Sequence, residues 1–254
     1  MASPMIQNVL FWFVFCFSAV VSMPYNGMDL YSDDYKLPDL PYPYNSLEPL
    51  IDEATVRVHH SGHHAAYTKK MNAALRQWRV DPDTDQTGLS SKSILDILTK
   101  ISEVPDMYRN AIRNNGGGFV NHNLYWSVMA PNPDGKERLP ESDLHNDIQA
   151  DFGNYTAFKQ HFTREAAKLF GSGYVWLSRQ PRDGSLLVST TANQDSPLSQ
   201  GLLPILVLDV WEHAYYLKHQ NRRTDHVSDW WTLVDWEVVA EIDAWWQKSV
   251  HDEL

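Results

Sequence analysis

The sequence predicts an α+β fold, in which an N-terminal α-helical hairpin domain precedes a mixed domain with a small three-stranded antiparallel sheet surrounded by helices. Helical patterning dominates the chain up to about residue 129, broken by the loop VDPDTDQTG. Three short runs rich in β-branched and aromatic residues follow at 174–178, 185–191 and 204–210, with turn residues between them. Helices first and a small sheet later is the order typical of α+β proteins.

Residues 1–22 are expected to be a signal peptide. The apolar run from Val9 to Val21 is short for a bilayer span and small residues follow it, so Ser22 is the expected last residue of the signal. An uncleaved membrane anchor is the alternative, because no Lys or Arg precedes the run. Cleavage is preferred because no stop-transfer pattern follows, and no membrane association is expected after it.

The chain ends in HDEL at residues 251–254, a sequence that a receptor reads as a retention signal for the endoplasmic reticulum. Together with the signal peptide it predicts residence in the lumen of that compartment, and a secreted protein with a chance acidic tail is the alternative. The one cysteine, Cys16, lies in the signal, so the mature chain is expected to fold without disulfides. Asn154 begins an N-x-[ST] sequon and is equally suited to cap a helix.

The polar segment 23–36 is expected to be a flexible extension. The proline-rich stretch after it leads to a helix expected to begin near Ser46, with Pro49 in its first turn, and to end at about Trp78. The motif APNPDG marks the boundary between the two halves. The expected domains are a helical hairpin domain over 37–130 and an α/β C-terminal domain over 131–250.

Further helices are expected around the sheet. In the first half they cover about 91–101 and 105–129, and in the second half the segment NYTAFKQHFTREAAKLFGSG. The last strand is expected to run into a helix over WEHAYYLKHQ, and one closing helix covers DWWTLVDWEVVAEIDAWW. The net charge of −11 argues against nucleic-acid binding, because a phosphate backbone requires clustered Lys and Arg.

Residue types that bind metals occur in three clusters: HHSGHH at 59–64, NHN at 121–123 and DVWEH at 209–213. On a helix, His59 and His63 share one face, and Asp209 and His213 share another. Spacing alone therefore predicts a histidine and carboxylate metal site and leaves open a zinc-type pairing of His59 with His63. Ordinary core or surface histidines are the alternative, which the surrounding Trp and Tyr weaken. Imidazoles with one carboxylate and no sulfur suit manganese or iron better than structural zinc.

Several blocks together resemble the iron/manganese superoxide dismutases. LPDLPYPYNSLEP, HHSGHHAAY, GGGFVNHNLYW, GSGYVWL, NQDSPL and DVWEHAYYL stand in the order found in that family and extend from Leu37 to about Ala244. DVWEHAYY is close to diagnostic, whereas the other blocks are suggestive one at a time. The resemblance implies that the metal ligands are His59, His122, Asp209 and His213, so His63 becomes a neighbour of the ligands.

The resemblance also implies roles for residues around the metal. Tyr67 matches the gateway tyrosine, Gln194 the glutamine that hydrogen-bonds the solvent on the metal, and Arg223 a funnel arginine. Trp126, Trp176 and Trp211 match an aromatic wall that keeps the site dry. The implied manganese type rests on Gln194, because the iron type carries its glutamine at the position of Gly118. Manganese, one ion per subunit, is therefore the expected metal, with iron possible.

The implied partners are superoxide and a second copy of the chain. Glu212 is expected to reach the partner's His213, and Tyr216 the partner's His63, in a dimer. Tetramer formation is in doubt because the segment between Tyr67 and Gly116 is longer than in many relatives. Two further departures are Tyr174, where the family commonly has tryptophan, and Gly62, where many relatives carry lysine; Tyr174 is expected to alter the pocket wall without loss of activity.

The activity implied is the disproportionation of superoxide to dioxygen and hydrogen peroxide through Mn(III)/Mn(II) cycling, with Tyr67 and Gln194 in the proton path. The alternative is a non-catalytic manganese-binding protein of the secretory pathway, which would have little reason to keep His63, Tyr67, Gln194 and Trp211. Because the chain is acidic and superoxide is an anion, local cations must attract it. Arg223 is expected to supply most of this attraction and Arg222 and Lys69 a smaller share, unless Arg223 is a surface charge or pairs with Asp225.

Overall fold

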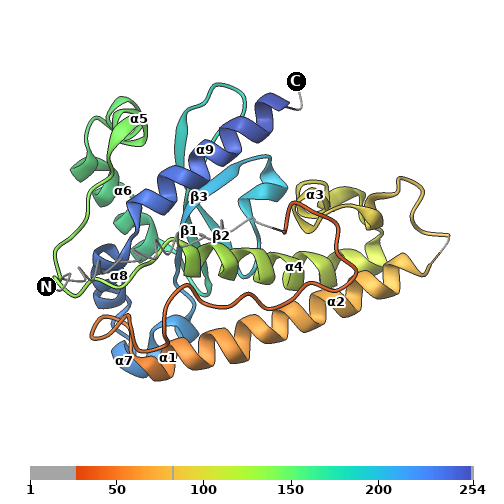
Figure 1. Cartoon of the computed structure of the whole chain (residues 1–254), viewed down its shortest axis with the longest axis horizontal. Helices are drawn as coiled ribbons and strands as arrows, with labels where there is room; N and C mark the ends of the chain where they lie inside the picture. The colour runs from red at the N-terminus through yellow and green to blue at the C-terminus, as the bar shows by residue number, and fades with distance from the viewer. Residues whose placement is uncertain (1–26, 82, 253–254) are drawn as a thin grey trace, which may run out of the picture.

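The computed structural model describes residues 27–81 and 83–252. Within them the expected α+β architecture is confirmed, with a helical half followed by a small antiparallel sheet that helices surround (Figure 1). The expected signal peptide over 1–22, with Cys16, and the last two residues of HDEL lie outside the described residues. In the described ranges, no helix has the length and apolar character needed to cross a membrane.

Two long helical segments lie side by side and form the hairpin (Figure 1). The first is made of three consecutive pieces, the second is a single helix, and a short helix lies between them in the chain: α1 (Glu53–Val58), η1 (His59–His64), α2 (Ala65–Arg79), α3 (Ile94–Thr99) and α4 (Asp106–Ser127). Two 3₁₀ turns flank α3, at Leu89–Ser91 and Ile101–Glu103. Apolar side chains such as Leu75, Leu98 and Ile112 are buried among these helices.

The hairpin begins later than the sequence suggested. Asp52 is the N-cap of α1, and its Oδ2 accepts a hydrogen bond from Thr55 N at 3.1 Å. The expected start near Ser46, with Pro49 in the first helical turn, is wrong, because the residues before Asp52 form turns. The Asp52 carboxylate pairs a backbone N–H that would otherwise be unpaired, which favours a helix start at this position.

The described part of the expected flexible extension, 27–36, packs against the hairpin. Tyr35 N donates to Asn72 Oδ1 at 3.0 Å, and Asn72 Nδ2 donates back to Tyr35 O at 2.8 Å. The guanidinium of Arg79 lies 4.6 Å from the ring centre of Tyr31. The expectation of a flexible segment is therefore wrong for this part. The side chain of buried Asn72 pairs with both backbone groups of Tyr35, as a residue of a neighbouring strand would.

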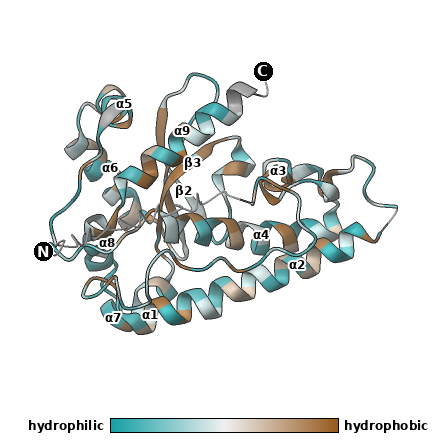
Figure 2. Ribbon diagram, in the orientation of Figure 1, coloured by the Kyte–Doolittle hydropathy of each residue, from teal (hydrophilic) through white to brown (hydrophobic). Residues whose placement is uncertain are grey.

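The sheet lies in the second half and has the strand order β2-β1-β3, all antiparallel. Its strands confirm the three expected runs: β1 (Gly173–Arg179), β2 (Leu186–Ala192) and β3 (Leu203–Asp209). Every residue of β1 is buried, and the hydropathy colouring shows the strands as mostly apolar (Figure 2). The helices around the sheet are α5 (Ser142–Phe152), α6 (Tyr155–Lys168), α8 (Arg223–Leu233) and α9 (Trp236–Asp252). Asn154 caps α6, its side chain accepting from Ala157 N at 2.9 Å.

Two expected helices of the second half differ from the structure. The segment WEHAYYLKHQ is not one helix, but a 3₁₀ turn η5 (Glu212–Ala214) followed by the single-turn α7 (Tyr216–His219). The closing helix is interrupted at Val234, whose extended backbone pairs with Met129 and separates α8 from α9. The interruption is fixed by backbone hydrogen bonds from Ala130 N to Leu233 O and from Asp235 N to Val128 O.

Candidate metal centre

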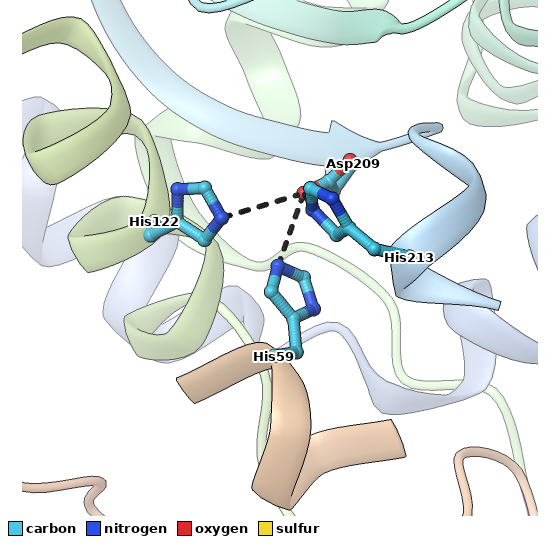
Figure 3. Close-up of side chains that lie close together, drawn as sticks. All are labelled: His59, His122, Asp209 and His213. Carbon is cyan, nitrogen blue, oxygen red and sulfur yellow. Dashed lines mark hydrogen bonds and ion pairs between the residues drawn. The ribbon is translucent and has the colours of Figure 1, made fainter. Parts of the chain in front are cut away.

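Four side chains converge between the two halves of the chain: His59, His122, Asp209 and His213 (Figure 3). One donor atom from each lies within 4.8 Å of the donor atoms of the other three. Asp209 Oδ2 is 3.2 Å from His59 Nε2, 3.3 Å from His213 Nε2 and 4.0 Å from His122 Nε2. The predicted ligand set is thus brought together, and His63 is not part of this group.

Each of the four residues comes from a different element. His59 opens the π-helical turn η1, in which Ala65 N–H bonds to His60 O five residues back. His122 lies within α4, Asp209 is the last residue of β3, and His213 lies in η5 (Figure 3). The expectation that Asp209 and His213 share a helical face is therefore wrong: the chain turns between the strand and the 3₁₀ turn. π-helical turns inside α-helices occur frequently at functional sites.

The donor atoms have the chemistry that a metal ion requires. His122 Nδ1 lies 2.6 Å from Gly118 O, and since a carbonyl only accepts, Nδ1 carries the hydrogen and Nε2 keeps its lone pair. Nε2 of His59 and of His122 are buried without a hydrogen-bond partner among the described residues. Bonds from a metal ion to nitrogen or oxygen are about 2 Å long, so two donor atoms on opposite sides of one ion lie about 4 Å apart. The four donor atoms lie within 4.8 Å of one another and therefore fit around one ion after small movements. A bound cation accounts for these buried nitrogens without a hydrogen-bond partner.

Burial sets the charges of the site before any ion binds. It lowers the pKa of His59 to about 3 and holds the pKa of His122 well below its usual range, so both imidazoles are neutral. Burial alone would raise the pKa of Asp209, but the adjacent His213 and His59 outweigh it and hold that pKa below the usual range. Three imidazole nitrogens with one carboxylate suit a divalent or trivalent ion of the manganese and iron class.

A hydrogen-bonded chain lies beside His122. Tyr67, on α2, has its ring centre 5.2 Å from that of His122, and its hydroxyl oxygen lies 3.3 Å from Gln194 Nε2. Gln194 Oε1 in turn lies 3.0 Å from the hydroxyl of Tyr174. Tyr174 is the residue that was expected to alter the pocket wall. Burial raises the pKa of both Tyr67 and Tyr174, so both phenols are neutral hydrogen-bonding groups.

Two glycines of α4 allow this chain to approach the site. A Cβ at Gly117 would lie 2.1 Å from Gln194 O, and one at Gly118 would lie 2.6 Å from the Tyr67 ring. No side chain fits at either position unless its neighbour moves. Gly118 is thus covered by Tyr67 and cannot carry a glutamine in this arrangement.

The three predicted wall tryptophans do not contribute equally. Trp126 packs edge-on against His59 at 4.6 Å, and Trp211 stacks on His213 at 5.2 Å between ring centres. Trp176 is buried behind Tyr174, at 5.5 Å, and its indole N–H bonds to Thr191 Oγ1. Trp126 and Trp211 therefore enclose the metal ligands, whereas Trp176 supports them through Tyr174.

The residues predicted to meet a second subunit are partly or fully exposed. His63 stacks on His213 at 4.3 Å and is partly exposed. Glu212 is exposed, and Tyr216 is 49% exposed. These side chains are accessible in the single chain.

Arg223 donates from Nε to Tyr215 Oη at 3.3 Å and from Nη2 to Gly171 O at 2.8 Å. A pairing of Arg223 with Asp225 is wrong, because Asp225 pairs with Arg222 at 2.9 Å. Among the described residues, no carboxylate lies within ion-pair distance of Arg223. The charge of Arg222 is thus compensated, and that of Arg223 is not.

Several residues that position the site were not assigned a role from the sequence. Asn121 Nδ2 lies 3.2 Å from Gln194 O, and Arg113 pairs with Asp195 through its Nε at 2.6 Å, so both hold the turn that carries Gln194. His226 Nε2 donates to Asp209 O at 2.9 Å from α8. The role of Asn121 could have been predicted from its position directly before the predicted ligand His122. Nothing in the sequence around Arg113 or His226 indicates their roles.

Comparison with known proteins agrees with this geometry. Residues 34–130 match the family model described as iron/manganese superoxide dismutases, alpha-hairpin domain, and residues 140–242 match the model of the C-terminal domain. The chain is 43% identical over 208 residues to "Superoxide dismutase [Mn/Fe] 2" of Staphylococcus aureus strains Mu50 and N315. The alignment covers 82% of this chain and 96% of each relative. With both domain models matched and the His₃Asp group assembled, the chain belongs to the iron/manganese superoxide dismutase family.

Proposed function

We propose that the protein is a superoxide dismutase of the manganese type, which converts two superoxide anions and two protons into dioxygen and hydrogen peroxide. The observation that carries the manganese assignment is the place of the glutamine. Gln194 reaches Tyr67 from the turn after β2, while Tyr67 covers Gly118, the alternative position for a glutamine. Placement of such a group tunes the redox potential of a metal.

The roles proposed for the residues follow from their positions. His59, His122, Asp209 and His213 would hold the ion, which when bound supplies a reversible one-electron change between two oxidation states. Tyr67 and Gln194, joined by a hydrogen bond, hold and deliver protons at the phenolic oxygen. Trp126 and Trp211 exclude water from the ligands.

The proposal is tested by metal analysis of the purified native protein together with a superoxide-consumption assay. We expect about one manganese per chain and rapid consumption of superoxide that disappears when the metal is removed. Bound manganese without superoxide consumption would instead favour the non-catalytic manganese-binding protein. Bound iron with full activity would overturn the manganese assignment but not the proposed activity.

Gln194→Ala is expected to keep the metal but to slow turnover by about 10–100-fold and to shift the midpoint potential, because the ligands remain while the amide beside them is lost. Metal content, turnover and a redox titration measure the three quantities. Gln180→Ala is the matched control, since Gln180 bonds Ser185 in a surface turn. An unchanged rate and potential in Gln194→Ala would count against the role of this amide.

Arg223 is proposed to attract superoxide, since its charge is uncompensated by a carboxylate. Arg223→Glu should lower the second-order rate at low ionic strength, and added salt should shrink the difference from wild type. Because Arg223 also holds backbone carbonyls, Arg223→Lys is the control: it keeps the charge but loses the planar hydrogen-bonding group. A wild-type rate for the Glu variant at low salt would locate the attraction elsewhere.

A two-fold dimer is proposed in which Glu212 reaches the partner's His213 and Tyr216 reaches the partner's His63. The support is the exposure of Glu212 and Tyr216, and of Phe170, which is 99% exposed beside the carbonyls held by Arg223. We expect sedimentation at micromolar concentration to give a dimer, and Glu212→Lys to shift it toward monomer. A monomeric wild-type protein would refute the contact.

Residence in the endoplasmic reticulum, through the signal over 1–22 and HDEL at 251–254, is also proposed, with Asn154 open to glycosylation there. Deletion of residues 251–254 should send the protein to the medium. A protein that stays inside the cell after this deletion would contradict retention by HDEL. An unchanged mass after treatment with an N-glycan-removing enzyme would show that Asn154 serves only as a helix cap.

A further inference from the structure

We propose that a surface cavity beside α2 binds a phosphate group, either free or carried by a small organic molecule. The cavity lies between one face of α2 and residues 34–37, which run alongside that helix (Figure 1). Its volume of about 310 Å³ is at the lower end of the range for small-molecule sites. The inference goes beyond the proposed function and does not depend on it, because it concerns a different part of the molecule.

The cavity is on the side of α2 that faces away from the metal centre. The α2 residues that line it include Thr68, Lys69, Asn72 and Arg76, which share one face of the helix. With 3.6 residues per turn, these positions lie about 150° around the helix axis from Tyr67, whose ring lies beside a metal ligand. Lys69, which was expected to help attract superoxide, therefore lines this cavity on the opposite side of α2 from Tyr67.

The buried polar groups of the cavity are already hydrogen-bonded within the chain. The Asn72 side chain pairs with both backbone groups of Tyr35, and Thr68 Oγ1 donates to His64 O at 2.9 Å. Asn72 and Thr68 are each only 5% exposed. These bonds hold the two walls of the cavity together, and they leave the binding of a ligand to the charged side chains at its rim.

The charged side chains at the rim favour an anion. Three of the lining residues are cations, Lys36, Lys69 and Arg76, and one is an anion, Asp34. The cavity therefore carries a net charge of +2, whereas the whole chain carries −11. A local cluster of positive charge attracts anions even on an acidic protein, because salt screens the more distant negative charges.

These cations are available to a ligand. In the described part of the chain, no carboxylate lies within ion-pair distance of Lys69. Asp34 accepts from Lys36 Nζ at 2.9 Å and from Arg76 Nη1 at 2.7 Å, but all three side chains are between 47% and 83% exposed. Ion pairs as exposed as these contribute little to stability, so an anion of higher charge can replace Asp34 as the partner of both cations.

The kinds of cation present suit a phosphate group. A phosphate group on an organic molecule carries nearly two negative charges at neutral pH, and its three oxygens accept hydrogen bonds. The planar guanidinium of Arg76 can donate two parallel hydrogen bonds to such a group, while Lys36 and Lys69 provide compact positive charges. A singly charged anion such as chloride gains less from the same three cations, because the attraction grows with the product of the charges.

The test is calorimetric titration of the metal-loaded protein with inorganic phosphate and with glycerol 3-phosphate, at an ionic strength fixed with sodium chloride. Lys69→Gln removes the cation that has no carboxylate partner. Lys70→Gln is its matched control, because Lys70 is an exposed lysine of α2 that does not line the cavity. Asp34→Asn removes the competing carboxylate, and Asp33→Asn makes the same change of charge outside the cavity.

We expect Lys69→Gln to weaken phosphate binding about fivefold, as the loss of one exposed charged contact would. Asp34→Asn should bind phosphate more tightly than Asp33→Asn, and Lys70→Gln should bind it as wild type does. Tighter binding of glycerol 3-phosphate than of phosphate would identify an organic phosphate as the ligand, and equal binding would identify free phosphate. Absence of saturable binding, or an equal loss in Lys69→Gln and Lys70→Gln, would overturn the proposal.

Crystals soaked in phosphate show where the anion binds. Density between Lys36, Lys69 and Arg76 would support the site, whereas an anion bound only at the metal centre would refute it. Binding and its location are measured here without turnover. A protein that consumes no superoxide would therefore defeat the proposed function and leave the phosphate site to be decided by the titrations.

Discussion

Asp209→Ala is expected to abolish metal binding and, with it, superoxide consumption. Asp209 is the one anionic group among the four donors, and its Oδ2 lies within 4.0 Å of all three histidine nitrogens. The variant would leave three neutral imidazoles to hold the whole charge of the ion. Loss of a residue that only hydrogen-bonds a metal ligand lowers metal affinity about 10–100-fold. Loss of the ligand Asp209 itself should lower the affinity by more.

Metal content per chain and turnover should fall together in Asp209→Ala, while circular dichroism reports whether the fold is kept. Asp225→Ala is the matched control, because Asp225 is an exposed carboxylate of α8 that pairs with Arg222. The control should retain both metal and activity. Full metal occupancy in Asp209→Ala would remove Asp209 from the ligand set.

Gly117→Ala should give the largest loss of stability among single-methyl substitutions at the site. The added Cβ would lie 2.1 Å from the backbone oxygen of Gln194, so the turn after β2 or α4 itself must move. Overpacking of this kind costs about 1–3 kcal/mol, and a contact with backbone belongs at the upper end. Activity should fall as well, because the displaced turn carries the Gln194 amide.

Denaturant unfolding and residual turnover measure these two effects. Gly62→Ala is the control, since Gly62 is an exposed helical residue whose added Cβ would have its nearest neighbour at 3.8 Å. That change should be neutral or should stabilise the protein by about 0.5–1 kcal/mol, because alanine favours helical backbone over glycine. Equal stability of Gly117→Ala and wild type would show that the close approach is not required.

The strands could be predicted because local residue types determine them, and the ligand residues could be predicted because their motifs resemble those of a known family. The runs that became β1 to β3 are bounded by turn residues and rich in residues that favour strands. His59, His122, Asp209 and His213 were placed by motif, and the structure brings them together. In these cases neighbouring residues in the sequence carry the information.

Where prediction failed, contacts between distant segments decide the structure. An uninterrupted helix from residue 229 to 246 satisfied the local pattern, but Val234 pairs with Met129, about a hundred positions earlier. The segment 27–36 is polar, but Asn72 hydrogen-bonds its backbone. In the π-helical turn at His59–His64 the backbone hydrogen bonds reach five residues back instead of four, and nothing in the sequence indicated this change of register.

The origin of the four donors has a thermodynamic consequence. His59 and His122 belong to the helical hairpin, whereas Asp209 and His213 belong to the half that contains the sheet. An ion bound to all four would cross-link two halves that packing and hydrogen bonds already join, and the four donors converge only in the folded chain. At a free metal concentration 100 times its dissociation constant, such an ion adds about 2.7 kcal/mol to the free energy of unfolding. The free energy of unfolding therefore rises with the free metal concentration, and the increase stabilises both halves of the chain.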